Sequence, residues 1–315
     1  MEQQEPIIFV SHLTKDYGYG RGVFDVSLSV TKGMCYGYLG PNGAGKSTTI
    51  RHIMGFSKPT TGKVQIFGMD SFGHTDRILG EVGYLPGEPS IPAGLTGKAF
   101  LKMMGDMRGM KDGGRSEELL NTFRLDPSPN VKEMSLGDKR KLAIVAAFMH
   151  DPEVLVLDEP TSGLDPLMQQ VFIRFVVDEK KRGKTILLSS HIFSEVEATC
   201  DVISIIKDGK HVSTFDANEV KNIPLKMYVL RFRAPKDYES YLAACPFEVV
   251  RTRVERNEVT VKFDQDQYDA FISSVLDYKI DTFAEKPFTL QDYFMSFYKE
   301  EKEFGGLQGV VGNKK

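Results

Sequence analysis

GPNGAGKST, residues 40–48, has the G-x-x-x-x-G-K-[ST] spacing of a loop that binds phosphate groups. The apolar segment MCYGYL (34–39) precedes it and is expected to form a strand, and STTIRHIMGF (47–56) follows it and is expected to form a helix. A chance glycine-rich turn is the alternative, and a strand before the loop with a helix after it disfavours that alternative. The nine residues therefore predict an α/β domain with a nucleotide-binding loop.

Each part of this loop has an expected task at a nucleotide. The backbone N–H groups from Asn42 through Ser47 are expected to surround the β-phosphate, and the Lys46 ammonium is expected to reach the β- and γ-phosphate oxygens. The hydroxyl of Ser47 is expected to be a ligand of Mg²⁺. The residues expected to contact the nucleotide here are Gly40, Asn42, Gly43, Ala44, Gly45, Lys46, Ser47 and Thr48.

Two adjacent carboxylates end the apolar segment VLVLDEP, residues 154–160. Asp158 is expected to hold the water shell of Mg²⁺, and Glu159 is expected to orient or deprotonate the attacking water. An Asp-Glu pair at a strand end can also merely cap the next turn. The phosphate-binding loop earlier in the chain favours the catalytic interpretation.

Apolar periodicity switches between strand-like and helix-like over the first two thirds of the chain. VLVLDEP and TILLSS (185–190) are short continuous apolar runs, typical of central strands that are covered on both faces. Between them, residues 166–183 predict a helix, with Pro166 near its start and Gly183 just beyond its end. Strand, helix and strand in this order predict a parallel sheet.

Two further segments extend this prediction. VFDVSLSV (23–30) alternates apolar and polar residues, which predicts a half-buried strand. The residues expected on its buried face are Phe24, Val26, Leu28 and Val30. The segment from about 88 to 150 is expected to be almost wholly helical and to form an insertion that stands off the sheet.

After about residue 215 the pattern changes to strand, helix, strand, strand, helix, strand, helix. The first six elements have the order of a ferredoxin-like split βαβ unit. We therefore expect a large domain over residues 1–215, a smaller α+β domain over 216–303 and a flexible tail over 304–315.

Composition limits the class of protein. The chain has 315 residues and a mass of 35.3 kDa, with 40 Lys and Arg against 43 Asp and Glu. A net charge of -3 gives no sign of a surface that binds nucleic acid, so none is expected as a partner. The three cysteines are expected to be reduced thiols. We expect neither a signal peptide nor a membrane-spanning helix, because no apolar run approaches 18 residues.

MSLGDKRK, residues 134–141, contains a second anion-binding pattern. A Ser-x-Gly segment that opens a helix favours an anion, because free backbone N–H groups and the helix dipole both attract negative charge. The residues alone leave open which anion this is, since the chain has a more complete phosphate loop elsewhere.

Five motifs in order, GPNGAGKST, MSLGD, VLVLDEP, SGLDP (162–166) and LLSSH (187–191), resemble the ATP-binding subunit of an ATP-binding cassette (ABC) transporter. The resemblance covers roughly residues 5–215 and implies a P-loop NTPase cassette with a mixed sheet and a helical insertion. It implies that Ser135 and Gly137 grip the γ-phosphate of ATP bound to the opposite protomer. Two copies would close head to tail over two ATP molecules and two Mg²⁺ ions.

The resemblance assigns three further residues. Tyr17 is similar to the aromatic residue that stacks on adenine; Tyr19 is the fallback, and a plain surface tyrosine is the alternative. Asp165 would couple the two sites across the interface. His191 would contact the γ-phosphate and help to hold the attacking water.

Two departures from the family pattern stand out. MSLGDKRK resembles the family's signature segment, in which Gly and Gln are the commonest residues where this chain has Leu136 and Asp138. We expect these two substitutions to alter the affinity with which two copies close on each other, while ATP binding survives. Gly87 stands where the family has a glutamine that touches the metal shell. Glu88 is our hypothesis for a substitute metal ligand, and a solvated loop carboxylate is the equal alternative.

A weaker resemblance concerns FTLQDYFMSFYKEE (288–301), which is similar to the tails of ATPase subunits of bacterial drug, antibiotic and peptide exporters. It favours export over import through a separate integral membrane permease, whose cytoplasmic helix would sit near residues 87–100. The chain would then be a peripheral protein on the cytoplasmic side of the membrane. The alternatives are a soluble mechanochemical ATPase and a regulatory module that binds nucleotide without hydrolysis.

Overall fold

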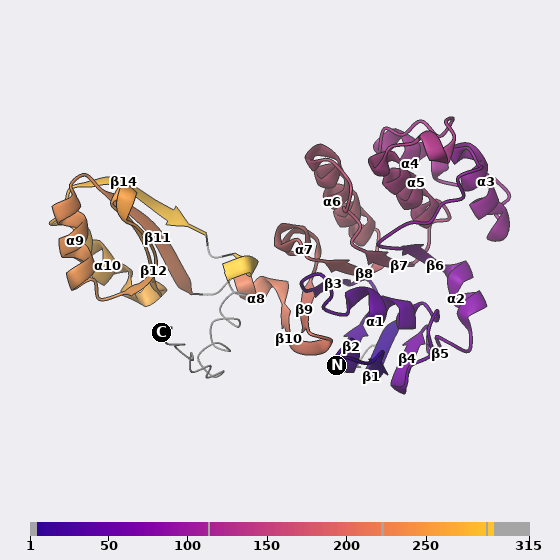
Figure 1. The fold of residues 1–315 in the computed structure, drawn as a ribbon, viewed down its shortest axis with the longest axis horizontal. Helices are drawn as coiled ribbons and strands as arrows, with labels where there is room; N and C mark the ends of the chain where they lie inside the picture. The colour runs from indigo at the N-terminus through magenta and orange to yellow at the C-terminus, as the bar shows by residue number, and fades with distance from the viewer. Residues whose placement is uncertain (1–4, 113, 222–223, 288, 293–315) are drawn as a thin grey trace, which may run out of the picture. The chain divides into compact units, whose positions relative to one another are not determined.

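The computed structural model describes residues 5–112, 114–221, 224–287 and 289–292 (Figure 1). The chain divides into two compact units, Met1–Ala217 and Asn218–Lys315. The expected tail over 304–315 lies outside the described residues, and so does most of the segment 288–301.

The first unit is built around a six-stranded sheet in the order β10-β9-β3-β8-β7-β6. Neighbouring strands are parallel except β10 and β9. Every residue of β3, β7 and β8 is buried, which explains their continuous apolar sequences. The strands are β3 (Cys35–Leu39), β6 (Val82–Leu85), β7 (Val154–Asp158), β8 (Thr185–Ser190), β9 (Val202–Lys207) and β10 (Lys210–Asp216).

Pairing along the parallel strands places their carboxyl ends together. Leu39 of β3 lies opposite Ser190 of β8, and Asp158 of β7 lies opposite Ser189. The loops that follow β3, β7 and β8 therefore meet at one edge of the sheet, where open α/β sheets bind their ligands.

A second, antiparallel sheet of this unit has the order β2-β1-β4-β5. Its strands are β1 (Ile8–Asp16), β2 (Gly22–Val30), β4 (Thr61–Ile66) and β5 (Met69–Asp70). Helix α1 (Lys46–Ile53) contacts β1, β2 and β4 on one side and β7 on the other, so it packs between the two sheets (Figure 1). Helices α6 (Pro166–Lys181) and α7 (Phe193–Thr199) follow β7 and β8.

The expected buried face of β2 is wrong at its first residue. Val26, Leu28 and Val30 are buried, but Phe24 is only half-buried and Val23 takes its place in the core. The cause is a register shift opposite Leu13 and Lys15, where Asp25 has φ 56°. An extra residue in the strand reverses the alternation of faces.

The segment between β6 and β7 contains α3 (Gly97–Met107), α4 (Ser116–Thr122), the 3₁₀ helix η1 (Val131–Glu133) and α5 (Leu136–Phe148). The expectation that it is almost wholly helical is wrong for residues 88–96 and 123–130. Prolines at 89, 92, 127 and 129 explain this, because proline lacks a backbone donor and restricts the residue before it. Helix α2 (Thr75–Glu81) precedes β6.

The described part of the second unit contains an antiparallel sheet in the order β12-β13-β11-β14. Its elements are β11 (Leu225–Phe232), α9 (Pro235–Ala244), β12 (Glu248–Arg253), η2 (Val254–Arg256), β13 (Glu258–Asp264), η3 (Gln265–Gln267), α10 (Tyr268–Val275) and β14 (Ile280–Lys286), and α8 (Ala217–Lys221) spans the boundary. This strand order is that of a split βαβ unit. Aromatic residues such as Phe232, Tyr241 and Phe271 fill its core.

Two further features concern the cysteines and the question of a membrane-spanning helix. Cys35 and Cys200 are far apart in sequence, but their Sγ atoms lie 3.7 Å apart as buried free thiols. Among the described residues, no helix combines the length and the apolar character that crossing a membrane requires.

Candidate nucleotide-binding site

The loop between β3 and α1 has a backbone that only its glycines allow. Gly43 and Gly45 have φ values of 81° and 107°, in a region that favours glycine. A Cβ at Gly40 would lie 2.3 Å from the carbonyl oxygen of Ile206. The loop is also anchored from outside, because Gly40 N–H donates to Ser190 O at 3.2 Å and Gly209 N–H donates to Ala44 O at 2.9 Å.

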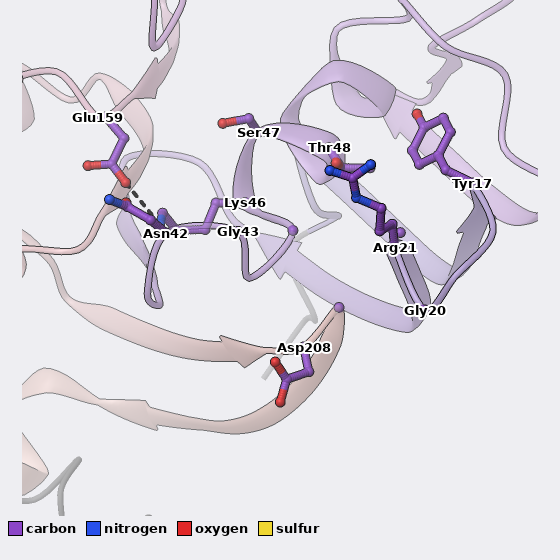
Figure 2. A pocket seen from close by; sticks show the side chains of 13 residues that line it. Tyr17, Gly20, Arg21, Asn42, Gly43, Lys46, Ser47, Thr48, Glu159 and Asp208 are labelled. Carbon is purple, nitrogen blue, oxygen red and sulfur yellow. Dashed lines mark ion pairs between the residues drawn. The ribbon is translucent and has the colours of Figure 1, made fainter.

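Lys46 is a buried cation at the start of α1. Its ammonium donates to the carbonyl oxygens of Gly40 at 2.7 Å and Pro41 at 3.0 Å. It also forms an ion pair with Glu159, whose Oε1 lies 2.9 Å away (Figure 2). A phosphate oxygen that reached Lys46 would therefore compete with the Glu159 carboxylate for the same ammonium.

Glu159 is held by its backbone and by both carboxylate oxygens. It follows β7 with φ 48°, an unusual value for a residue other than glycine, and its N–H donates to Ser189 O at 3.1 Å. Its Oε2 lies 2.5 Å from Nδ1 of His191. Strained backbone that the surroundings hold in place is typical of functional sites.

Asp158 is the last residue of β7, directly before Glu159, and is almost fully buried. One oxygen, Oδ1, accepts a hydrogen bond from Ser189 Oγ at 2.5 Å. The other, Oδ2, would be 3.1 Å from a Cβ built on Gly87. The residue that departs from the family glutamine therefore brings its backbone, rather than a side chain, against Asp158.

These residues border a cavity of about 510 Å³. Figure 2 shows Glu159 and Lys46 on one side of it and Tyr17 and Arg21 on the other. The expected site residues that line it are Tyr17, Asn42, Gly43, Gly45, Lys46, Ser47, Thr48 and Glu159. The volume is in the range of small-molecule sites.

The cavity also has walls that the sequence reasoning missed. They are Gly20, Arg21, Gly22, Asp208 and Gly209. Gly209 O accepts a hydrogen bond from Phe24 N–H at 2.7 Å, so the β9–β10 turn and the start of β2 form one wall. The only signal in the sequence was the glycine-rich stretch 18–22 around the two tyrosines.

Of the two tyrosines considered for adenine, Tyr17 lines the cavity and Tyr19 does not. Tyr17 is half-exposed, and the ammonium of Lys15 lies 5.8 Å from the centre of its ring. Tyr19 is fully exposed. An exposed ring at the rim of a cavity has a free face on which a base can stack.

The oxygen groups here fit Mg²⁺ bound mainly through a nucleotide. Ser47 supplies a hydroxyl and Asp158 a carboxylate, and Mg²⁺ prefers oxygen ligands. Within the described residues there is no group of three or more His, Cys, Asp or Glu suited to a metal ion. Few protein ligands are expected where Mg²⁺ keeps waters and substrate phosphates as its other ligands.

Several expected site residues do not line this cavity, namely Gly40, Ala44, Glu88, Ser135, Gly137, Asp158, Asp165 and His191. Ser135 is the N-cap of α5; its Oγ accepts from Asp138 N–H at 3.1 Å and donates to Asp138 Oδ2 at 2.7 Å. Gly137 follows in the first turn of the same helix. Asp165 caps α6 by accepting from Met168 N–H at 3.0 Å. Asp138 thus engages the serine hydroxyl that is expected to contact phosphate.

Glu88 is exposed and lines none of the cavities described here. The structure does not bring it to Ser47 or Asp158. Its part in the metal shell stays a hypothesis that requires the loop to shift.

A second, apolar cavity of about 420 Å³ lies between α2, α3, α5 and the segment after β6. Its lining includes Phe100, Met104 and Met107 of α3 and Ala143, Ala146 and Ala147 of α5. Met107 is 73% exposed. We call this cavity the α3–α5 groove.

Glu195, in helix α7, has a buried carboxyl group. Ser190 Oγ donates a hydrogen bond to its Oε2 at 2.5 Å. Burial is the main cause that raises its pKa from 4.5 to about 7, and the charge of Glu159 acts in the same direction. Thr161 and Arg140 also face this carboxyl and act in the opposite direction.

A stability prediction follows from Glu195. Because the folded chain holds this proton more tightly than the unfolded chain, the free energy of unfolding falls as pH rises from 4.5 towards 7. Glu195→Gln is expected to raise stability by about 1 to 3 kcal/mol at pH 8 and by little at pH 5. Thermal unfolding at both pH values measures this, and an equal gain at both would contradict it.

The chain is similar in sequence to known proteins. The family model described as "ABC transporter" matches residues 23–162. The chain is 38% identical over 218 residues to the bacitracin transport ATP-binding protein BcrA of Bacillus licheniformis, covering 68% of this chain and 71% of that protein. It is 33% identical over 302 residues to the uncharacterized ABC transporter ATP-binding protein YcbN of Bacillus subtilis, covering 92% and 96%.

The fold is also similar to that of a solved structure. It is described as the ATP-binding subunit of an ABC transporter, and it superposes with a TM-score of 0.62 at 31% identity. The alignment covers 68% of this chain and 92% of that one.

Proposed function

Because the chain belongs to the ATP-binding subunits of ABC transporters and is an ATPase of that family, we propose that two copies close head to tail over two ATP molecules to drive export. The observation that carries the proposal is the Lys46–Glu159–His191 cluster at the carboxyl edge of the parallel sheet. Each ATP would lie between one chain's phosphate loop and the Ser135–Gly137 segment of the other.

Hydrolysis would proceed by direct attack of water on the γ-phosphorus. The backbone N–H groups of the loop and the Lys46 ammonium would bind the β- and γ-phosphates, and the Tyr17 ring would stack on adenine. Ser47 and Asp158 would hold Mg²⁺, which supplies positive charge to the phosphates when bound.

Glu159 would take the proton of the attacking water. Its carboxylate is free to do so once phosphate oxygens replace it at Lys46, and His191 holds Oε2 in place. The water oxygen forms the new bond to phosphorus, the bond to the β-phosphate oxygen breaks, and ADP leaves. Asp165, at the start of α6, would connect the two sites across the interface.

We further propose that the partner is a separate integral membrane permease, which places the chain on the cytoplasmic face of the membrane. The relative from Bacillus licheniformis carries the description of a bacitracin transport protein, which supports a drug or peptide antibiotic as cargo. The α3–α5 groove is apolar and lies at the predicted docking region near residues 87–100, so a short amphipathic helix of the permease would fit it.

Met107→Asp is expected to weaken this docking, because a carboxylate in an apolar interface loses its hydration. The tagged full-length chain would be isolated from detergent-solubilised membranes of its native cell and bound proteins quantified by mass spectrometry. We expect wild type to recover a polytopic protein in stoichiometric amount and Met107→Asp to recover at least about fivefold less of it. The ATP turnover of the isolated chain is expected to be unchanged.

Leu276→Asp is the matched control, since Leu276 is 72% exposed on the second unit and lies outside the groove. It is expected to recover the partner as wild type does. If wild type instead recovers ribosomes, DNA or no partner, the transport proposal fails and a soluble mechanochemical ATPase becomes the better account.

A further inference from the structure

Arg140 is a buried arginine in the first turns of α5, five residues after Ser135. Only 2% of its surface is exposed. Among the residues that the structure describes, it forms no ion pair with a carboxylate. Its guanidinium instead donates to five backbone carbonyl oxygens, those of Pro86, Gly87, Asp158, Glu159 and Pro160.

These carbonyls belong to two segments that are far apart in sequence. Nη1 donates to Pro86 O at 2.6 Å and Gly87 O at 3.1 Å, in the segment after β6. Nε donates to Pro160 O at 2.9 Å, and Nη2 donates to Asp158 O at 2.9 Å and to Glu159 O. One side chain on α5 therefore joins the Gly87 segment to the backbone of both acidic residues.

The chemistry of this position requires arginine. A guanidinium has five N–H donors in a planar fork, whereas lysine has a single nitrogen and glutamine has two N–H donors. Burial lowers the pKa of Arg140 to about 10, and the nearby charges of Asp158, Glu195 and Glu159 oppose that change. The group therefore stays cationic at neutral pH, and its carbonyl partners replace the water it has lost.

The contact to Glu159 falls on a strained residue. Glu159 has φ 48°, and its backbone is fixed by its N–H on Ser189 and by its carbonyl on Arg140. The direction of its carboxylate depends on that backbone. Pro86 also lines the α3–α5 groove, so the same guanidinium is hydrogen-bonded to a residue that borders the groove.

We propose that Arg140 is a positioning residue that couples the α3–α5 groove and helix α5 to the catalytic carboxylate of Glu159. This inference rests on the proposed role of Glu159. A displacement of the Pro86–Gly87 segment or of α5 is transmitted through the guanidinium to the Glu159 backbone, and so to the position of the attacking water.

Arg140→Lys tests this in the full-length chain. We expect kcat for ATP to fall about tenfold or more while KM and the affinity for a fluorescent ATP analogue stay within about twofold. A residue that only stabilises the fold would not lower kcat in a chain that is fully folded at the assay temperature. Thermal unfolding confirms that condition, and Arg140→Gln serves as the second variant if the lysine variant does not fold.

Arg115→Lys is the matched control. Arg115 also uses its guanidinium fork, on Glu118, Asp151 and Glu179, and in the described part of the chain it forms no hydrogen bond or ion pair with the Glu159 segment. It is expected to lower stability and to leave kcat within about twofold of wild type.

Two results would overturn the inference, and they are distinguishable. A folded Arg140 variant with wild-type kcat, alongside an inactive Glu159→Gln variant, refutes the coupling through Arg140 alone. A Glu159→Gln variant with wild-type kcat refutes the proposed function and the coupling with it.

Discussion

Replacing Glu159 by glutamine is expected to lower ATP turnover by about 10²- to 10⁴-fold. The affinity for ATP is expected to stay within about twofold of wild type or to increase. The amide keeps the size of the side chain and still accepts from His191, but it has no basic oxygen to take a proton from water. It also no longer holds Lys46 at 2.9 Å as an ion pair, so the ammonium is freer to bind phosphate.

Phosphate release from Mg-ATP measures the turnover, and titration with a fluorescent ATP analogue measures the affinity. Glu153→Gln is the matched control, because its carboxylate is exposed and, among the residues that the structure describes, its ion pair is with Lys32 at 3.6 Å. Wild-type turnover in Glu159→Gln would show that another group activates the water. Loss of binding together with turnover would show that Glu159 acts on nucleotide affinity.

Gly137→Asp is expected to lower turnover by about 10²-fold without loss of ATP affinity. In the proposed pair of chains this position faces the γ-phosphate of the other chain's ATP, and a carboxylate there repels it. A Cβ at this position would also lie 3.2 Å from Gly163 O, which crowds the start of α5. The phosphate loop of the same chain is untouched, so a single chain still binds ATP.

Gly94→Asp is the control for Gly137→Asp. A Cβ at Gly94 has no heavy atom within 4 Å, so the same charge is added to open surface. Its turnover is expected to equal that of wild type. Wild-type turnover in Gly137→Asp would show that the Ser135–Gly137 segment is not part of the ATP site.

The fold class could be predicted because its determinants are local. The P-loop spacing and the continuous apolar strands predicted an α/β cassette, and the solved relative at 31% identity confirms that fold. Phe24 was misplaced because its burial depends on a bulge, which is a property of two paired strands rather than of one segment.

The site was predictable to the extent that its residues follow strand ends. Lys46, Glu159 and His191 come from three different segments, and parallel pairing brings them together. Arg21 and Asp208 were missed because they reach the cavity through turns whose positions depend on tertiary packing.

Arg140 shows the same limit for burial. In the sequence it is one letter of the charged run DKRK, and such a run normally faces solvent. Only the convergence of five carbonyls from distant segments makes its burial favourable, and that convergence is not encoded near residue 140.

The most direct test of the account is the mass of the Glu159→Gln chain in solution, measured by sedimentation with and without saturating Mg-ATP. We predict one copy of 35.3 kDa without nucleotide, two copies with Mg-ATP, and one copy again when Gly137→Asp is added. A single copy at saturating Mg-ATP, with wild-type turnover per chain independent of protein concentration, would contradict the shared site.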